Sequence, residues 1–365
     1  ILFVFFLEFC FSIELNKSSN TDSNLCVKSS KQSKIYKSFW KYFDEKYAVF
    51  EQRLPNGTTW FSIGQHFCSK IHKKTKDKKL FKLILKSIRM LNDGHSGIKS
   101  RSLKKDKDGW ATPYIYQKQV NQIENLVEKN YLQNNLKWAA NDKIGWGLLR
   151  NTTYGYFVVK DMEYLSGEDA SGKDKRAALK AMRKVMQSIG DSDACIIDIR
   201  GNEGGWDAVS RAIASVFTPQ KQLVWSEWKR VGAEHSALGD ATLRYVEPNS
   251  DEVLLQYYDK PVVVLQSGGT FSAAETFGLA MKLLPHVRFV GERSSGHFSD
   301  IFSANIASGW KVFSSNRLLI HADGKTFENI GLPVDVEIPF NDVMFQQGTD
   351  VQLEGAIALL RKNEI

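Results

Sequence analysis

The sequence predicts an α/β protein with a small helical subdomain at its N-terminal side. From Gly155 onward, short apolar runs alternate with amphipathic stretches, as strands and helices do in an α/β core. Between residues 34 and 97, apolar side chains instead recur at helical spacing. The length of 365 residues suits one such large unit with an appendage, and the composition (42% hydrophobic, 25% charged) excludes a mostly disordered, collagen-like or multi-span membrane chain.

Residues 1–33 predict a signal-like leader and a polar linker. Residues 1–7 are all apolar but too few for a transmembrane span, which needs about 20 residues. Such a run is typical of the hydrophobic region of an export signal. The stretch 16–33 is rich in Ser and Asn, as linkers are. We therefore expect a secreted protein, periplasmic or extracellular; if the apolar run is not a signal peptide, the protein is cytoplasmic.

Residues 34–97 predict the helical subdomain. Two sets of apolar residues follow a helical period on either side of a Leu-Pro-Asn-Gly turn: Phe39, Trp40, Phe43 and Tyr47, then Leu80, Ile84, Ile88 and Leu91. Much of the net charge of +8 lies in this N-terminal part, with its densest lysine run between residues 73 and 79. Such runs are most often a solvated helix face, so we expect no nucleic-acid partner.

Residues 98–365 predict the α/β core. Strands are expected at 156–159, 194–199 and 261–265, and helices at 177–189, 206–217, 273–284 and 351–361. The four cysteines are too few for a disulfide scaffold and too scattered for a zinc site, and the chain has neither a CxxC nor an HExxH motif.

A serine is expected at the start of one core helix. The segment 268–275 places Ser272 after a buried strand and a Gly-rich turn, where the helix of Ala273 begins. A hydroxyl there stands beside free backbone N–H groups and a favourable helix dipole, as an acyl-transfer nucleophile requires. The same pattern also fits an ordinary N-cap serine.

Glycines follow the strand at 194–199. Gly204 and Gly205 allow the backbone to approach a substrate closely, and their N–H groups are candidates for an oxyanion hole. In the same segment, Asp198 and Arg200 are expected to form a structural ion pair. The alternative for the glycines is a plain strand-to-helix turn.

Two further segments carry candidate groups. His95 stands in a turn after the second apolar helix, and histidine is the natural base for a serine nucleophile at neutral pH. Glu328 could orient that histidine and stabilise its charged form, as the acid of a triad does. Alone, each is one residue among several of its type.

Taken in order, these segments resemble the tail-specific, or C-terminal-processing, family of serine peptidases, and within it the tricorn-core-like branch. The shared motifs are Leu91…His95, Asp198…Gly205, Ser272…Glu275, Gly291…Gly296 and Glu328…Asp335. The resemblance implies a crotonase-like (ClpP-like) core and a serine peptidase. It implies Ser272 as nucleophile, His95 as base, Glu328 as its support, and an oxyanion hole formed by Ala273 with Gly204 or Gly205.

The departures from the family pattern concern the base. Where the processing branch has a lysine base, this sequence has His297, which makes His297 the alternative base. The tricorn-like branch links its glutamate to the histidine through a serine that precedes the histidine, and here that position is Gly94. Glu328 must then reach His95 directly, or through Ser96 or a water. The interval from Gly97 to Gly155 is too short for the PDZ module of the processing branch.

The resulting hypothesis is a peptidase that acts on a peptide or protein substrate without a metal or organic cofactor and has no transmembrane span. It could form oligomers, since helical subdomains often mediate assembly. One alternative is a non-catalytic module on the same fold that binds apolar ligands. Another is an acyl-CoA enzyme of the crotonase type, which would use paired N–H groups without Ser272.

Overall fold

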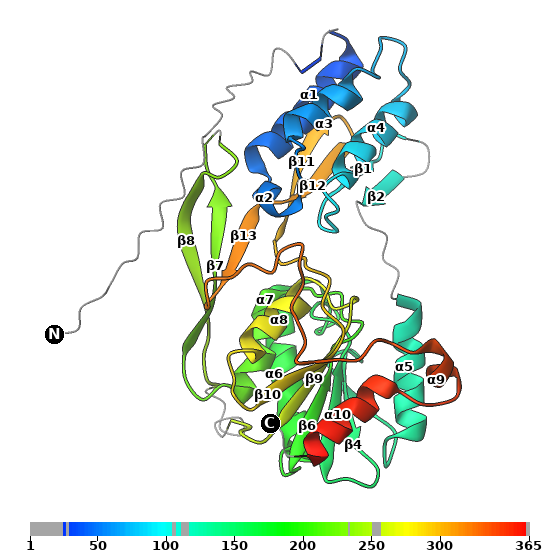
Figure 1. Cartoon of the computed structure of the whole chain (residues 1–365), viewed down its shortest axis with the longest axis vertical. Helices are drawn as coiled ribbons and strands as arrows, with labels where there is room; N and C mark the ends of the chain where they lie inside the picture. The colour runs from blue at the N-terminus through cyan, green and yellow to red at the C-terminus, as the bar shows by residue number, and fades with distance from the viewer. Residues whose placement is uncertain are drawn as a thin grey trace, which may run out of the picture.

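The computed structural model describes residues 25–26, 29–103, 107–110, 117–232, 234–249 and 257–362 (Figure 1). The expected signal-like leader falls in residues 1–24, outside these ranges. The first helix begins at Lys31, inside the expected linker. None of the helices in the described ranges is both long and apolar enough to span a bilayer.

A mixed seven-stranded sheet forms the centre of the larger lobe. Its strand order is β14-β10-β9-β6-β5-β4-β3. The first five strands in that order are parallel, and β4 and β3 add to the edge in antiparallel fashion. The bounds are β3 (Lys137–Ala139), β4 (Ile144–Leu148), β5 (Tyr154–Val159), β6 (Ala194–Asp198), β9 (Val262–Gln266), β10 (Val287–Gly291) and β14 (Val336–Glu337).

Helices cover both faces of this sheet, because its strands are apolar on both sides. Phe157 and Val159 of β5 belong to the core with α6 (Ser171–Ile189), α7 (Asp207–Ala214) and α8 (Ala273–Met281). Tyr156 and Val158 belong to the opposite core, with α5 (Gln117–Asn130), α9 (Asp342–Gln346) and α10 (Val351–Arg361). The short 3₁₀ helix η2 (Ser215–Phe217) extends α7. The predicted α/β alternation is thus confirmed.

The N-terminal helices form a second lobe, at the top of Figure 1. They are α1 (Lys31–Lys46), α2 (Phe50–Arg53), α3 (Trp60–Cys68) and α4 (Asp77–Arg89). They share an aromatic-rich core with a four-stranded antiparallel sheet of order β11-β12-β1-β2. Its strands are β1 (Gly97–Ser100), β2 (Lys107–Trp110), β11 (Ile301–Ala307) and β12 (Trp310–Ser315). Late segments of the chain therefore complete the lobe that the early helices begin.

A third, antiparallel sheet of order β13-β7-β8 runs between the two lobes along one side (Figure 1). It consists of β7 (Gln222–Arg230), β8 (Leu238–Val246) and β13 (Arg317–His321). β13 follows β12 directly, so the chain passes from the upper lobe back to the larger one through this sheet.

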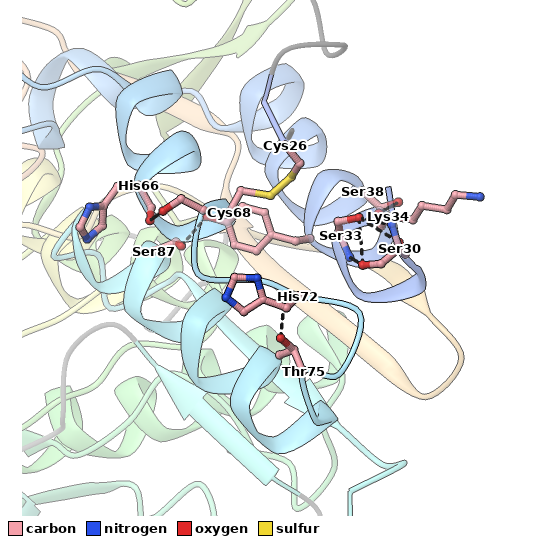
Figure 2. Close-up of a disulfide and its surroundings, with 12 residues drawn as sticks. Cys26, Ser30, Ser33, Lys34, Ser38, His66, Cys68, His72, Thr75 and Ser87 are labelled. Atoms are coloured by element: carbon pink, nitrogen blue, oxygen red, sulfur yellow. Dashed lines mark hydrogen bonds between the residues drawn. A yellow bond between two sulfur atoms is a disulfide. The ribbon is translucent and has the colours of Figure 1, made fainter. Parts of the chain in front are cut away.

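One disulfide, Cys26–Cys68, joins the segment before α1 to the last residue of α3 (Figure 2). Cys195 on β6 is a buried free thiol. Counting cysteines did not predict this bond, because the spacing of two cysteines along the sequence does not show that a helical hairpin brings them together.

Candidate active site

The predicted glycine, serine and histidine segments leave the central sheet at one edge. β6, β9 and β10 are parallel neighbours, so their carboxyl ends lie side by side. Gly204 and Gly205 follow β6, Ser272 follows β9, and His297 follows β10. Ligands of open α/β sheets bind at this kind of edge.

Ser272 is the N-cap of α8 and has an unusual backbone conformation. Its φ is +56° and its ψ is −122°. A non-glycine residue in such a conformation is strained, and strain of this kind gathers at functional sites. The residue is half-buried. The N–H of the next residue, Ala273, donates no hydrogen bond within the described part of the chain.

The glycine turn lies directly against Ser272. A methyl group at Gly204 would stand 2.7 Å from the Cβ of Ser272 and 2.7 Å from the backbone nitrogen of Ala273. The Gly204 N–H donates to Oδ1 of Asn202 at 2.8 Å. The Gly205 N–H has no acceptor among the residues described. Of the two predicted oxyanion donors, the geometry therefore favours Gly205, because the N–H of Gly204 is already used.

Glu275 fixes the turn of Ser272 to the loop after β10. Its buried carboxyl group accepts hydrogen bonds from Ser294 Oγ (2.6 Å) and from the N–H groups of Gly296 (2.6 Å) and His297 (2.7 Å). It also accepts the N–H of Ser272 at 3.2 Å. Burial raises the pKa of Glu275 to about 7, against the lowering effect of these donors. Through Glu275, the Ser-Ala-x-Glu motif thus fixes the turn of Ser272 and the loop after β10 to each other.

A cleft of about 410 Å³ opens beside Ser272 and Gly205. Its walls combine apolar and charged side chains, among them Trp206, Phe302, Arg211, Arg244 and Asp300. Trp206 is 36% exposed and Ile301 is 47% exposed, so apolar surface is available at its rim. A cleft of this size lies within the range of ligand-binding sites in proteins.

His95 is completely buried in the turn between α4 and β1. Its ring lies edge-on to Phe271 at 4.7 Å between centroids, and Phe271 precedes Ser272 in the chain. Both of its ring nitrogens are buried and lack a hydrogen-bond partner within the described residues. Burial is the main cause that lowers the pKa of His95 to about 4, so the imidazole is neutral at pH 7.

His297 contacts the same phenylalanine and also lies next to His95. Its ring stacks on Phe271 at 4.7 Å and stands 5.9 Å from the ring of His95. Its Nδ1 shares a hydrogen bond with Ser295 Oγ at 3.0 Å. Burial lowers the pKa of His297 to about 3. The two candidate bases are therefore neighbours, and neither of them is hydrogen-bonded to Ser272 within the described residues.

Glu328 makes its hydrogen bonds to Arg53 and to the backbone of Phe298. Its Oε1 accepts two hydrogen bonds from Arg53, at 2.8 Å from Nε and 2.5 Å from Nη2, and its Oε2 accepts the N–H of Phe298 at 2.9 Å. Ser96, the proposed bridge, donates to Asp93 instead. The structure shows neither a direct hydrogen bond from Glu328 to His95 nor one through Ser96.

The ion pair predicted between Asp198 and Arg200 is confirmed. Arg200 is buried between Asp198 (2.6 Å) and Asp350 (2.8 Å), the N-cap of α10. It fixes α10 to the end of β6 and is not among the residues that line the cleft.

Arg53 is the residue of this region that sequence analysis missed. It ends a four-residue helix far from every motif, and its Nη1 and Nη2 also donate to the carbonyls of Asn92 and Gly296 at 2.5 Å each. No local pattern distinguishes it from the other arginines. As for metals, the described residues contain no group of three or more His, Cys, Asp or Glu that could hold an ion.

Comparison with known proteins agrees with the motif order. The model of peptidase family S41 matches residues 153–338, just over half of the chain. No curated protein matches the sequence.

Several solved structures have this fold. A candidate peptidase from Parabacteroides merdae is 22% identical with a TM-score of 0.74, over 91% of this chain and 97% of that one. Mature CPAF is 13% identical with a TM-score of 0.62, over 87% and 94%. The photosystem II D1 C-terminal processing protease is 12% identical with a TM-score of 0.50, over 85% and 94%. At these identities the likeness concerns the fold alone.

Proposed function

Because the chain belongs to peptidase family S41 and is thus a serine peptidase, we propose that Ser272 is its nucleophile and His95 its general base. The observation that carries the proposal is the strained backbone of Ser272 at a cleft, beside two free N–H groups. A serine that serves only as a helix N-cap does not require this strained backbone conformation. The match to a peptidase family also favours catalysis over an apolar-ligand module or a CoA-ester enzyme.

In the proposed reaction, the Ser272 hydroxyl attacks the scissile carbonyl and His95 takes its proton. The N–H groups of Gly205 and Ala273 stabilise the oxyanion, each contributing about 10²–10³ in turnover. His95 then protonates the leaving amine, and water hydrolyses the acyl-enzyme by the same steps. Catalytic hydrogen bonds often form only with substrate bound, so we propose that substrate in the cleft brings Ser272 and His95 into contact.

His297 is the competing base. Its Nδ1 pairs with Ser295 and its Nε2 is unpartnered, whereas both ring nitrogens of His95 are unpartnered, so each histidine has a nitrogen free to take a proton. We favour His95 because it stands at the histidine of the Leu91…His95 motif. Replacing each histidine by glutamine separates them: the base variant loses at least a thousandfold in kcat, and the other retains most activity.

We also propose finer assignments of fold, specificity and location. The central sheet and its helices constitute a crotonase-like core, and α1–α4 constitute the helical subdomain beside it. The enzyme is tail-specific and lacks a PDZ module, with the described residues between Gly97 and Tyr154 forming β1, β2, α5, β3 and β4. The protein is secreted by a signal peptide, and the Cys26–Cys68 disulfide supports an oxidising compartment.

The test of peptidase function is cleavage of an unfolded protein such as reduced casein by the purified full chain. Ser272→Ala is expected to lower turnover at least a thousandfold without a change in the melting temperature. The matched control is Ser188→Ala, an exposed serine on α6, which keeps wild-type turnover. Comparable cleavage by the two variants would contradict the assignment.

A further inference from the structure

A cluster of five buried ionisable side chains lies behind the nucleophile turn. Arg53, Asp93, His95, His297 and Glu328 are each at most 6% exposed. They come from α2, from the turn before β1, and from the loops after β10 and β13. With both imidazoles neutral, the cluster carries one positive and two negative charges. One surplus negative charge is thus buried beside two uncharged histidines.

Arg53 balances the negative charge of Glu328, so the surplus negative charge of the cluster lies elsewhere. Arg53 and Glu328 form an ion pair at 2.5 Å with both side chains fully buried. Two of the three hydrogen bonds to this carboxylate come from Arg53, and the third comes from the backbone of Phe298. A guanidinium in this two-point contact largely cancels the carboxylate's field at a third group.

Asp93 holds the remaining negative charge. Its Oδ1 accepts the backbone N–H of His95 at 2.9 Å, and its Oδ2 accepts Ser96 Oγ at 2.7 Å and Ser315 Oγ at 2.8 Å. These donors are all uncharged. Burial alone would raise the pKa of Asp93, but Arg53, His95 and His297 together with Ser96 hold it well below its usual range. Asp93 is therefore ionised at any pH at which the enzyme works.

We propose that Asp93, and not Glu328, is the positioning carboxylate of the base: it stabilises the imidazolium form of His95, while Arg53 cancels the charge of Glu328. This inference rests on the proposed role of His95 as base. Asp93 holds the backbone of His95 in place and offers a fixed negative charge at the moment when His95 takes the serine proton. Among the charged groups, Asp93 favours a charged His95, whereas Arg53 opposes it and is itself paired with Glu328.

Two variants of the full chain separate the carboxylates. Asp93→Asn keeps an oxygen acceptor for the His95 N–H but removes the surplus charge. The double variant Arg53→Met/Glu328→Gln removes the cancelled pair and leaves the net charge of the cluster unchanged. The measurements are kcat and KM on a peptide substrate from pH 3 to 8, with near-ultraviolet circular dichroism and melting temperature at each pH to verify the fold.

Asp93→Asn is expected to lower kcat at least a hundredfold with KM within threefold, and to move the acid limb of kcat/KM to lower pH. The double variant is expected to lose less than tenfold in kcat and to keep its acid limb in place. An equal or greater loss in a folded double variant would overturn the proposal. So would an unmoved pH profile in Asp93→Asn.

A second measurement does not depend on activity. In a Ser272→Ala background, the pKa of His95 is followed by NMR of labelled histidine. Asp93→Asn is expected to lower it and Arg53→Met to raise it, each by at least one unit, and absence of both shifts would refute the proposal. If Asp93→Asn does not fold, Arg53→Met alone decides. Failure of peptidase function would appear separately, as cleavage by Ser272→Ala that equals the wild type.

Discussion

The sequence predicts the position of Ser272 but not its backbone conformation. Its place at the start of a helix after a glycine turn could be predicted, because strand, turn and helix are each visible in the sequence. Its φ of +56° could not be predicted, since serine gives no sign of this conformation. The role of Glu275, which ties Ser272 to the loop of His297, likewise appears only when the two loops are seen together.

Gly204 gives a test at the same scale. Its φ is +99°, and a methyl group would press on the Cβ of Ser272 and the nitrogen of Ala273, both at 2.7 Å. Gly204→Ala is therefore expected to lower kcat at least a hundredfold and the free energy of unfolding by about 1–3 kcal/mol. Steady-state kinetics and urea unfolding measure the two effects. The control is Gly172→Ala in α6, where the nearest atom is a flexible arginine nitrogen at 3.8 Å, and which should be neutral or stabilising.

The pKa of His95 predicts the acid side of the pH profile. The base must be neutral, and burial together with Arg53 lowers its pKa to about 4 in spite of the opposing effect of Asp93. Since the neutral form then persists on acidification well below the usual 6.5, kcat/KM should stay near its maximum at pH 5 and fall only near pH 4. A half-maximal value at pH 6.5 or above would contradict a buried His95 as base in this environment.

At the scale of elements, the sequence predicts the core better than the connections. Strands β5, β6 and β9 and helices α6, α7, α8 and α10 lie where apolar periodicity places them. β11 and β12 were not predicted, although they complete the core of the N-terminal lobe. Along β11, exposed positions alternate with half-buried ones, so this strand lacks the continuous apolar run of a central strand.

A buried ion pair contributes to the attachment of α10 to the sheet. Asp350 caps α10 through the N–H groups of Gln352 and Leu353 and also binds Arg200. Asp350→Asn keeps the cap but leaves Arg200 with one carboxylate in a buried site. We expect unfolding free energy to fall by about 3 kcal/mol. Asp342→Asn at the exposed start of α9 is the control, and equal urea midpoints for the two variants would count against this role.

At the scale of the whole molecule, contacts between distant segments join the lobes. Arg53 and Glu328 are 275 residues apart, and no pattern in either segment indicates the other. The family resemblance predicted that the Ser272, Gly205 and His95 segments lie near one another, and in the structure these segments are in contact. The resemblance could not predict the ion pair between Glu328 and Arg53, because this pair depends on how the N-terminal lobe packs on the core.

The disulfide gives a prediction at this scale. Cys26–Cys68 closes a loop with a sequence separation of 42 and restricts the unfolded N-terminal lobe. The double variant Cys26→Ser/Cys68→Ser should lose about 2–4 kcal/mol in unfolding free energy. Reductant should lower the melting temperature of the wild type to that of the variant and leave the variant unchanged. Equal stability of the oxidised and reduced wild type would contradict a bond that stabilises this lobe.

The role of Ser272 as nucleophile is tested most directly by labelling the purified full chain with a fluorophosphonate and locating the modified residue by mass spectrometry. We expect one modified serine, Ser272, in the wild type and in Ser188→Ala. We expect no label in Ser272→Ala. Modification of a different serine, or no modification of folded protein even with peptide substrate present, would contradict Ser272 as the activated nucleophile.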